Sequence, residues 1–158
     1  MTVATYSRAQ IALHWTVAIL VVATWLLHDR MEEAFDARMD GDGVGALPLH
    51  AWLGLTVLAL TLIRLALRLT RGVPPPPADD PPAMQAAANW THRLIYLLLI
   101  AIPAGGAVAW FGQVEDAGDV HGTIANILMI IALGHALVAL WHQYVKKDGL
   151  LRRMMRAG

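Results

Sequence analysis

The sequence predicts an all-α integral membrane protein, folded as a bundle of four membrane-spanning helices. Its composition is the first reason: 57% of the 158 residues are hydrophobic and only 15% are charged, whereas about 25% of a typical soluble domain is charged. The second reason is that the hydrophobic residues lie in long blocks, each with the roughly 20 mainly apolar residues that a helix needs to cross a bilayer. We therefore expect residues 1–158 to form one membrane domain.

Four segments have the length and composition of a spanning helix. In order along the chain they run from about 9 to 27, 47 to 69, 90 to 110 and 121 to 144. In the third, Pro103 together with Gly105 and Gly106 predicts either a kink or a close contact with a neighbouring helix.

The segments between the spans are polar or rich in proline. Residues 29–45 are acidic and contain glycine, which predicts a loop with room for a short surface helix. Residues 72–82 include a run of four prolines. Because proline cannot continue a helix and favours extended backbone, we expect a semi-rigid connector there. Residues 112–120 predict a short polar turn.

Lysine and arginine predict the orientation, because they accumulate on the cytoplasmic side of membrane proteins. Ten of the twelve lie on the side of the two termini, and only Arg30 and Arg38 lie on the other. The ten are Arg8, Arg64, Arg68, Arg71, Arg93, Lys146, Lys147, Arg152, Arg153 and Arg156. Both termini should therefore face the cytoplasm. The outer side carries nine carboxylates: Asp29, Glu32, Glu33, Asp36, Asp40, Asp42, Glu115, Asp116 and Asp119.

The composition also excludes several kinds of site. There is no cysteine, so disulfides, iron–sulfur clusters, thiolate metal sites and covalently attached c-type haem are excluded. No basic stripe interleaves with aromatic residues, so nucleic acid is not an expected partner. No small-residue cleavage site follows the first apolar block, so we expect the first helix to remain in the mature protein.

The histidines are the strongest functional signal, because polar side chains inside a membrane are costly and tend to be functional. His14 and His135 lie well inside their spans, while His50 and His121 begin the second and fourth spans at similar depth. His121 and His135 are 14 residues apart, which is ~21 Å along one helix face. One helix could therefore serve two stacked haems, with His14 as the inner partner and His50 as the outer partner.

Spacing alone leaves alternatives open. A single membrane histidine can simply hydrogen-bond a neighbouring helix, although two depth-matched pairs make that interpretation weaker. Depth does not separate His135 from His142, and His28 could replace His50. His92 is more typical of an interfacial residue.

Taken together, several segments resemble the bacterial cytochrome b561 family of small di-haem cytochromes of the inner membrane. They are residues 6–15 (YSRAQIALHW), 50–54 (HAWLG), 63–68 (IRLALR), 91–96 (THRLIY), 121–126 (HGTIAN), 134–136 (GHA), 141–144 (WHQY) and 150–154 (LLRRM). The resemblance covers nearly the whole chain in order.

The resemblance implies a ligand set and a substrate class. It implies that His14 and His135 bind the iron of an inner haem b, that His50 and His121 bind the iron of an outer haem b, and that His142 is not a ligand. It also implies electron exchange with a membrane quinone, and at least one family member is a superoxide oxidase that passes electrons to ubiquinone.

The outer charge departs from what superoxide as a donor requires. A positive surface would steer that anion inward, yet nine acidic residues face two basic ones. An acidic face better suits a cationic partner, such as a basic electron-carrier protein.

Other residues at the inner boundary are candidates for quinone or propionate contacts. Arg64 and Arg68, one turn apart, could pair with haem propionates or a quinone carbonyl, or could extend to anionic lipid headgroups. Ser7, Arg8 and His142 form a candidate quinone site if the first and fourth helices adjoin, with interfacial anchoring as the alternative.

Three functions compete at this point. One is a quinone-linked oxidoreductase that works alone and resembles a superoxide oxidase. The second is a membrane anchor and electron conduit for a separate redox protein. The third is a metal or proton transporter that uses the same histidines, and it predicts a colourless protein.

Overall fold

The structure is a computed structural model that describes residues 5–41, 46–77 and 79–157, and all its regular elements there are helical. The α-helices are α1 (Arg8–Leu26), α2 (His28–Met39), α3 (Leu49–Arg71), α4 (Pro82–Gly112) and α5 (Glu115–Trp141). A π-helical turn (His142–Lys146) continues α5, and a short 3-10 helix (Leu151–Met154) follows it.

Four of these helices are long and apolar enough to cross a membrane: α1, α3, α4, and α5 with its π-helical continuation. Their outward faces remain apolar, with Leu69 76% and Ile130 72% exposed. Such a surface would be unfavourable in water but suits contact with lipid. The four predicted spans and the all-α membrane fold are confirmed.

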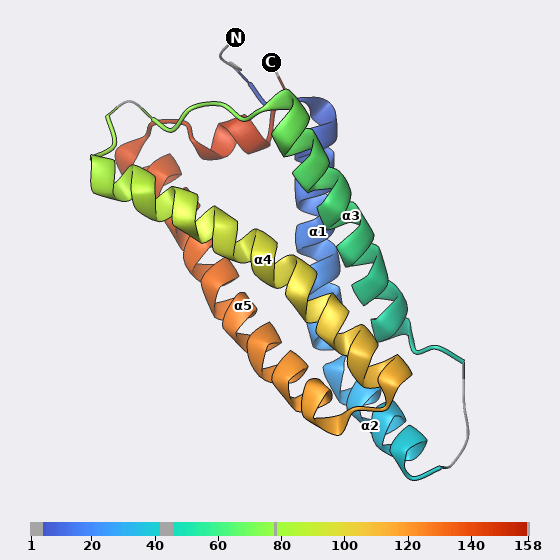
Figure 1. Cartoon of the computed structure of the whole chain (residues 1–158). Helices are drawn as coiled ribbons and strands as arrows, with labels where there is room; N and C mark the ends of the chain where they lie inside the picture. The colour runs from blue at the N-terminus through green and yellow to red at the C-terminus, as the bar shows by residue number, and fades with distance from the viewer. Residues whose placement is uncertain (1–4, 42–45, 78, 158) are drawn as a thin grey trace.

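The bundle is built around α4, which packs against both α3 and α5, while α1 packs against α3. Each spanning helix contributes one buried residue to the central apolar cluster. These residues are Val17, Val57, Leu99 and Leu128. The start of α1 and the C-terminal 3-10 helix lie at one end of the bundle, beside the proline connector, and α2 lies at the opposite end (Figure 1). This is the arrangement that four crossings of a membrane produce.

Two helices begin earlier than the sequence predicted. The third span begins at Pro82 rather than near 90, because proline is well tolerated in the first turn of a helix. The fourth begins at Glu115, so the predicted turn over residues 112–120 was wrong for residues 115–120. The turn is confined to Gln113 and Val114, and Gln113 has a left-handed conformation with φ 54°. Glu115 and Asp116 occupy the first turn of α5, where the helix dipole favours negative charge.

The predicted outer loop is mainly helical, since α2 occupies residues 28–39 of it. The outer carboxylate Asp42, the loop residue Gly45 and the connector residue Ala78 lie outside the described residues. The third span is continuous through Pro103. A close contact, the other expectation for this region, is found at Gly106.

The end of the bundle where α1 begins is called the inner end, after the orientation predicted from the sequence, and the end that carries α2 is called the outer end. Side-chain bonds hold the inner end together. Ser7 caps α1 in a reciprocal arrangement with Gln10, and the Gln10 Nε2 amide donates to the Gly72 carbonyl at 3.0 Å. Trp15 Nε1 donates to the Met154 carbonyl at 2.7 Å, and Arg153 donates to the carbonyl of Pro75 at 2.8 Å. The connector and the C-terminal segment are therefore tied to α1 and to each other.

Candidate functional site

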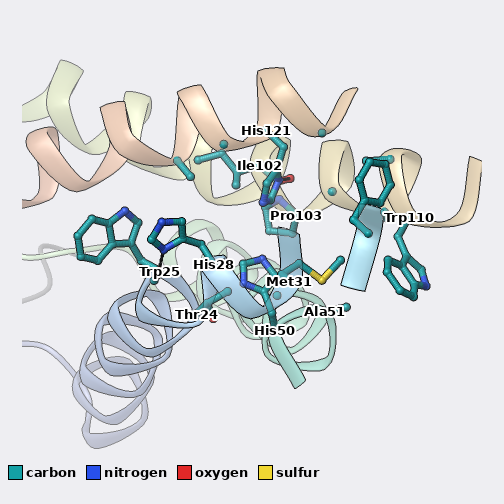
Figure 2. A pocket seen from close by; sticks show the side chains of 18 of the residues that line it. Thr24, Trp25, His28, Met31, His50, Ala51, Ile102, Pro103, Trp110 and His121 are labelled. Carbon is teal, nitrogen blue, oxygen red and sulfur yellow. Dashed lines mark hydrogen bonds between the residues drawn. The ribbon is translucent and has the colours of Figure 1, made fainter. Parts of the chain in front are cut away.

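A cavity of about 550 Å³ lies near the outer end of the bundle, between α1, α3, α4 and α5, with α2 across it. This volume falls within the range of small-molecule and cofactor sites. Its walls carry His50 from α3 and His121 from α5, among mainly apolar side chains. Figure 2 shows the two imidazoles pointing toward one another across this space.

The geometry of His50 and His121 suits two ligands to one metal. Their ring centroids are 5.9 Å apart, with the ring planes at 68°. Nδ1 of His121 lies 2.8 Å from the carbonyl oxygen of Ile102. Because a carbonyl can only accept, Nδ1 must carry the proton, which leaves Nε2 of the neutral ring free to bind a metal. Nδ1 of His50 is buried and has no hydrogen-bond partner among the described residues.

Two glycines on the cavity wall test whether a flat macrocycle fits. Gly54 lies one turn after His50, and Gly122 directly follows His121. Both line the cavity, and a Cβ on either one would meet no other group within 4 Å. The open space beside each histidine, the paired imidazoles and the apolar walls fit a b-type haem.

His28 also lines the cavity, but both its ring nitrogens have partners. Nδ1 lies 2.9 Å from the Trp25 carbonyl, and Nε2 lies 2.9 Å from Asp29. This disfavours His28 as the substitute for His50 that depth alone had left open.

The inner histidines are arranged differently. Nη2 of Arg64 lies 3.0 Å from Nδ1 of His14, while the ring of His135 lies beside that of His92, with centroids 5.2 Å apart. Arg64 is within electrostatic range of all three histidines. The structure thus gathers His14 and His135 around one arginine, and the cavity lining at the outer end includes neither of them.

Two of the three arginines of α3, Arg64 and Arg68, lie beside Tyr96 of α4. The guanidinium of Arg64 lies 5.4 Å from the ring centroid of Tyr96, and that of Arg68 lies 5.8 Å from it. Tyr6 is close to both arginines, and burial raises the pKa of its phenol, although Arg68 opposes this shift. Arg64 and Arg68 are therefore placed to contact a polar group inside the inner end.

His142 is only 2% exposed, and its Nδ1 lies 2.5 Å from Oδ2 of Asp148. Desolvation acts to raise the pKa of Asp148, but hydrogen bonds from His142 and from the Leu150 amide outweigh it, so the pKa lies below its ordinary value. Lys146 completes the cluster through an ion pair with the buried Asp80. Ser7, by contrast, is engaged in the α1 cap, and Arg8 is exposed.

Sequence reasoning missed this inner cluster of Asp80, His142, Lys146 and Asp148. Asp80 is 62 residues before His142, in the proline connector, and no local pattern relates the two. Only the six-residue spacing from His142 to Asp148, across the end of a helix, hinted at a contact.

Helix α2 covers the outer cavity. Met31 and Phe35 line it from one face of α2, and a Cβ on Gly118 would lie 3.5 Å from the Phe35 ring. Arg38 lies over the Trp110 ring, 4.8 Å from its centroid. Four carboxylates also line the cavity: Glu32, Asp36, Glu115 and Asp119. The acidic residues at this end that the structure describes are exposed.

Comparisons with known proteins place these features in context. A family model described as prokaryotic cytochrome b561 matches residues 5–157. The chain is 44% identical to a protein of Cereibacter sphaeroides named cytochrome b562, over 96% of this chain and 95% of that one. It is 30% identical to a probable superoxide oxidase of Yersinia pestis, over 95% of each chain. It is 28% identical to cytochrome b561 homolog 2 of Escherichia coli (strain K12), over 95% of this chain and 90% of that one.

Proposed function

Because the chain belongs to the prokaryotic cytochrome b561 family, whose members are membrane proteins that bind haem b, we propose that it transfers electrons between an outer-side donor and membrane ubiquinone. The observation that carries this proposal is the pair of imidazoles, His50 and His121, facing one another across a cavity with open space at Gly54 and Gly122. When bound, haem b supplies one-electron redox chemistry, and the protein supplies its ligands and a low dielectric.

In this proposal the chain holds two haems. His50 and His121 hold the outer one. His14 and His135 hold the inner one, and their support is the helical register: His135 lies 14 residues beyond His121 on α5. Gly134, adjacent to His135, has the same open space beside it as Gly122. Arg64, which contacts His14 in the structure, would with Arg68 contact an acidic group of the cofactor.

We place the quinone site at the inner boundary, near Ser7, Arg8 and His142. Quinone reduction consumes protons, and the hydrogen-bonded His142–Asp148 pair holds a proton at Nδ1 in a buried position. Arg8 offers an exposed cation to a quinone oxygen. The ten basic residues on this side support an orientation with both termini cytoplasmic, and the four helical spans and the family support the bacterial inner membrane.

Two donors are compatible with the proposal. The relative from Yersinia pestis is named a probable superoxide oxidase, which supports superoxide. The four carboxylates around the cavity favour instead a cationic redox protein, for which this chain would act as a membrane anchor and conduit. Family membership disfavours the third possibility, a histidine-based metal or proton transporter.

The test is ubiquinone reduction by the purified protein in liposomes, followed by absorbance. Reduction driven by a superoxide source alone supports an oxidoreductase that works by itself. Reduction that requires an added cationic one-electron carrier protein supports the conduit. Failure with both donors, in protein that carries its haems, would contradict electron transfer to quinone.

A further inference from the structure

Gly106 on α4 makes the closest glycine contact in the described part of the bundle. A Cβ at this position would lie 2.9 Å from both Cε1 and Nδ1 of the His121 ring, and 3.6 Å from Nε2. Cβ atoms do not approach other atoms below 3.0 Å. The neighbouring Gly105 differs completely, because a Cβ there would meet nothing within 4 Å. The imidazole of His121 therefore packs directly against the backbone of α4 at Gly106. Any side chain at this position would overlap the ring.

The same turn of α4 also supplies the hydrogen bond that orients the ring. Ile102, whose carbonyl accepts the Nδ1 proton of His121 at 2.8 Å, is four residues before Gly106 and so on the same face of the helix. The Ile102 carbonyl binds the ring at Nδ1, and the ring packs against Gly106. Together these contacts direct Nε2 toward the cavity and His50. A metal-bound histidine is commonly fixed in this way through its other ring nitrogen.

We propose that Gly106 is a positioning residue that fixes the orientation and tautomer of His121 as a haem ligand. The inference rests on the proposed function, in which His121 binds the outer haem. Any side chain at position 106 displaces the ring, because the ring is the movable end of its side chain whereas the α4 backbone is fixed by packing. The displacement breaks the bond to Ile102 and misaligns Nε2. The three atoms nearest to a Cβ at position 106 all belong to His121, and Gly106 lies in the wall of the outer cavity, so its effect is confined to the outer haem.

The experiment compares Gly106→Ala with Gly105→Ala in the full-length holoprotein. The two changes are equal in volume and in helix propensity, and they differ only in what the new methyl group meets. Haem content, the reductive titration and the electron paramagnetic resonance spectrum are measured for each. We expect Gly105→Ala to match the wild type. We expect Gly106→Ala to retain the inner haem but to lose the outer one at least tenfold more readily, or to show a changed outer-haem titration and spectrum.

The outcomes separate this inference from the proposed function. If wild type binds two haems and His121→Ala removes one, but Gly106→Ala titrates like wild type, the positioning role is wrong and the function stands. If the wild type binds no haem, both the positioning role and the proposed function are wrong.

A double variant covers the case in which Gly106→Ala folds poorly. If the His121 ring is the cause, adding Gly106→Ala to His121→Ala costs no further thermal stability. If the added change destabilises the double variant as much as it does the wild type, Gly106 serves helix packing instead and the proposal is overturned.

Discussion

The imidazole rings of His50 and His121 face each other from α3 and α5 with their centroids 5.9 Å apart. These residues are 71 positions apart in the sequence, and they meet because the antiparallel spans bring both to the outer end of the bundle. The two residues would hold a flat group from both faces, and the open space beside Gly54 and Gly122 would leave room for it. Several consequences of this arrangement can be measured.

Filling the open space beside the ligands should remove the outer haem. Gly122→Leu places a side chain where no other group lies within 4 Å, so the fold should tolerate it while the macrocycle is excluded. We expect haem content to fall from two per chain to about one, with little change in melting temperature. Gly105→Leu, also in open space but outside the cavity lining, is the control. Full haem content in Gly122→Leu would argue against a macrocycle beside Gly122.

Removing the charge of Arg64 should lower the potential of the inner haem. A nearby cation favours the reduced form, so Arg64→Gln should decrease the inner midpoint potential by about 60 mV, a tenfold change for one electron. The outer potential should stay constant. Arg71→Gln, an exposed arginine at the end of the same helix, should change neither. If Arg64→Gln and Arg71→Gln shift the inner midpoint potential equally, Arg64 acts only as one of several surface charges.

The His142–Asp148 pair should stabilise the inner end in a pH-dependent way. A carboxyl whose pKa is lower in the folded chain contributes stability above its unfolded pKa, near 3.8, and loses it as pH falls through the folded value. Asp148→Asn should therefore reduce stability by about 1 kcal/mol at neutral pH, with the difference from wild type shrinking below pH 4. Thermal unfolding in detergent measures this. The exposed Asp79→Asn should be neutral, and a deficit in Asp148→Asn that is constant with pH would exclude the ionised pair as its source.

The carboxylates of α2 should separate the two donors. Because a negative rim repels anions and attracts cations, Glu32→Gln combined with Asp36→Asn should accelerate haem reduction by superoxide several-fold at low salt. The same variant should slow reduction by a cationic carrier protein. Glu33→Gln lies on the same helix outside the cavity lining and should have a smaller effect. If the rate of haem reduction depends neither on the removed carboxylates nor on the salt concentration, neither donor approaches the haem past α2.

The four spans, the common side of the two termini and the outer histidine pair could be predicted from the sequence. Hydropathy and depth are local properties, and His50 and His121 needed only antiparallel helices to meet. The start of α4 at Pro82 was missed because eight helical residues precede its apolar block, and hydropathy alone does not include them. The start of α5 at Glu115 was missed because its first turn is acidic.

Long-range packing accounts for what the sequence did not reveal. Gly105 and Gly106 are adjacent glycines that no sequence pattern tells apart. Only the position of α5 shows that the His121 ring packs against Gly106. The cover formed by α2 depends on Phe35 reaching Gly118, and the Asp80–Lys146 pair joins segments 66 residues apart. The partners of the inner histidines likewise depend on where Arg64 points.

The most direct test of the account is a reduced-minus-oxidised visible spectrum with haem quantitation on the purified protein. It should be made alongside single alanine variants of His14, His50, His121 and His135. We predict two b haems per chain, with His50→Ala and His121→Ala each removing one haem and His14→Ala and His135→Ala each removing the other. A wild-type protein that stays colourless after haem supplementation would contradict the account and leave the histidines to another role.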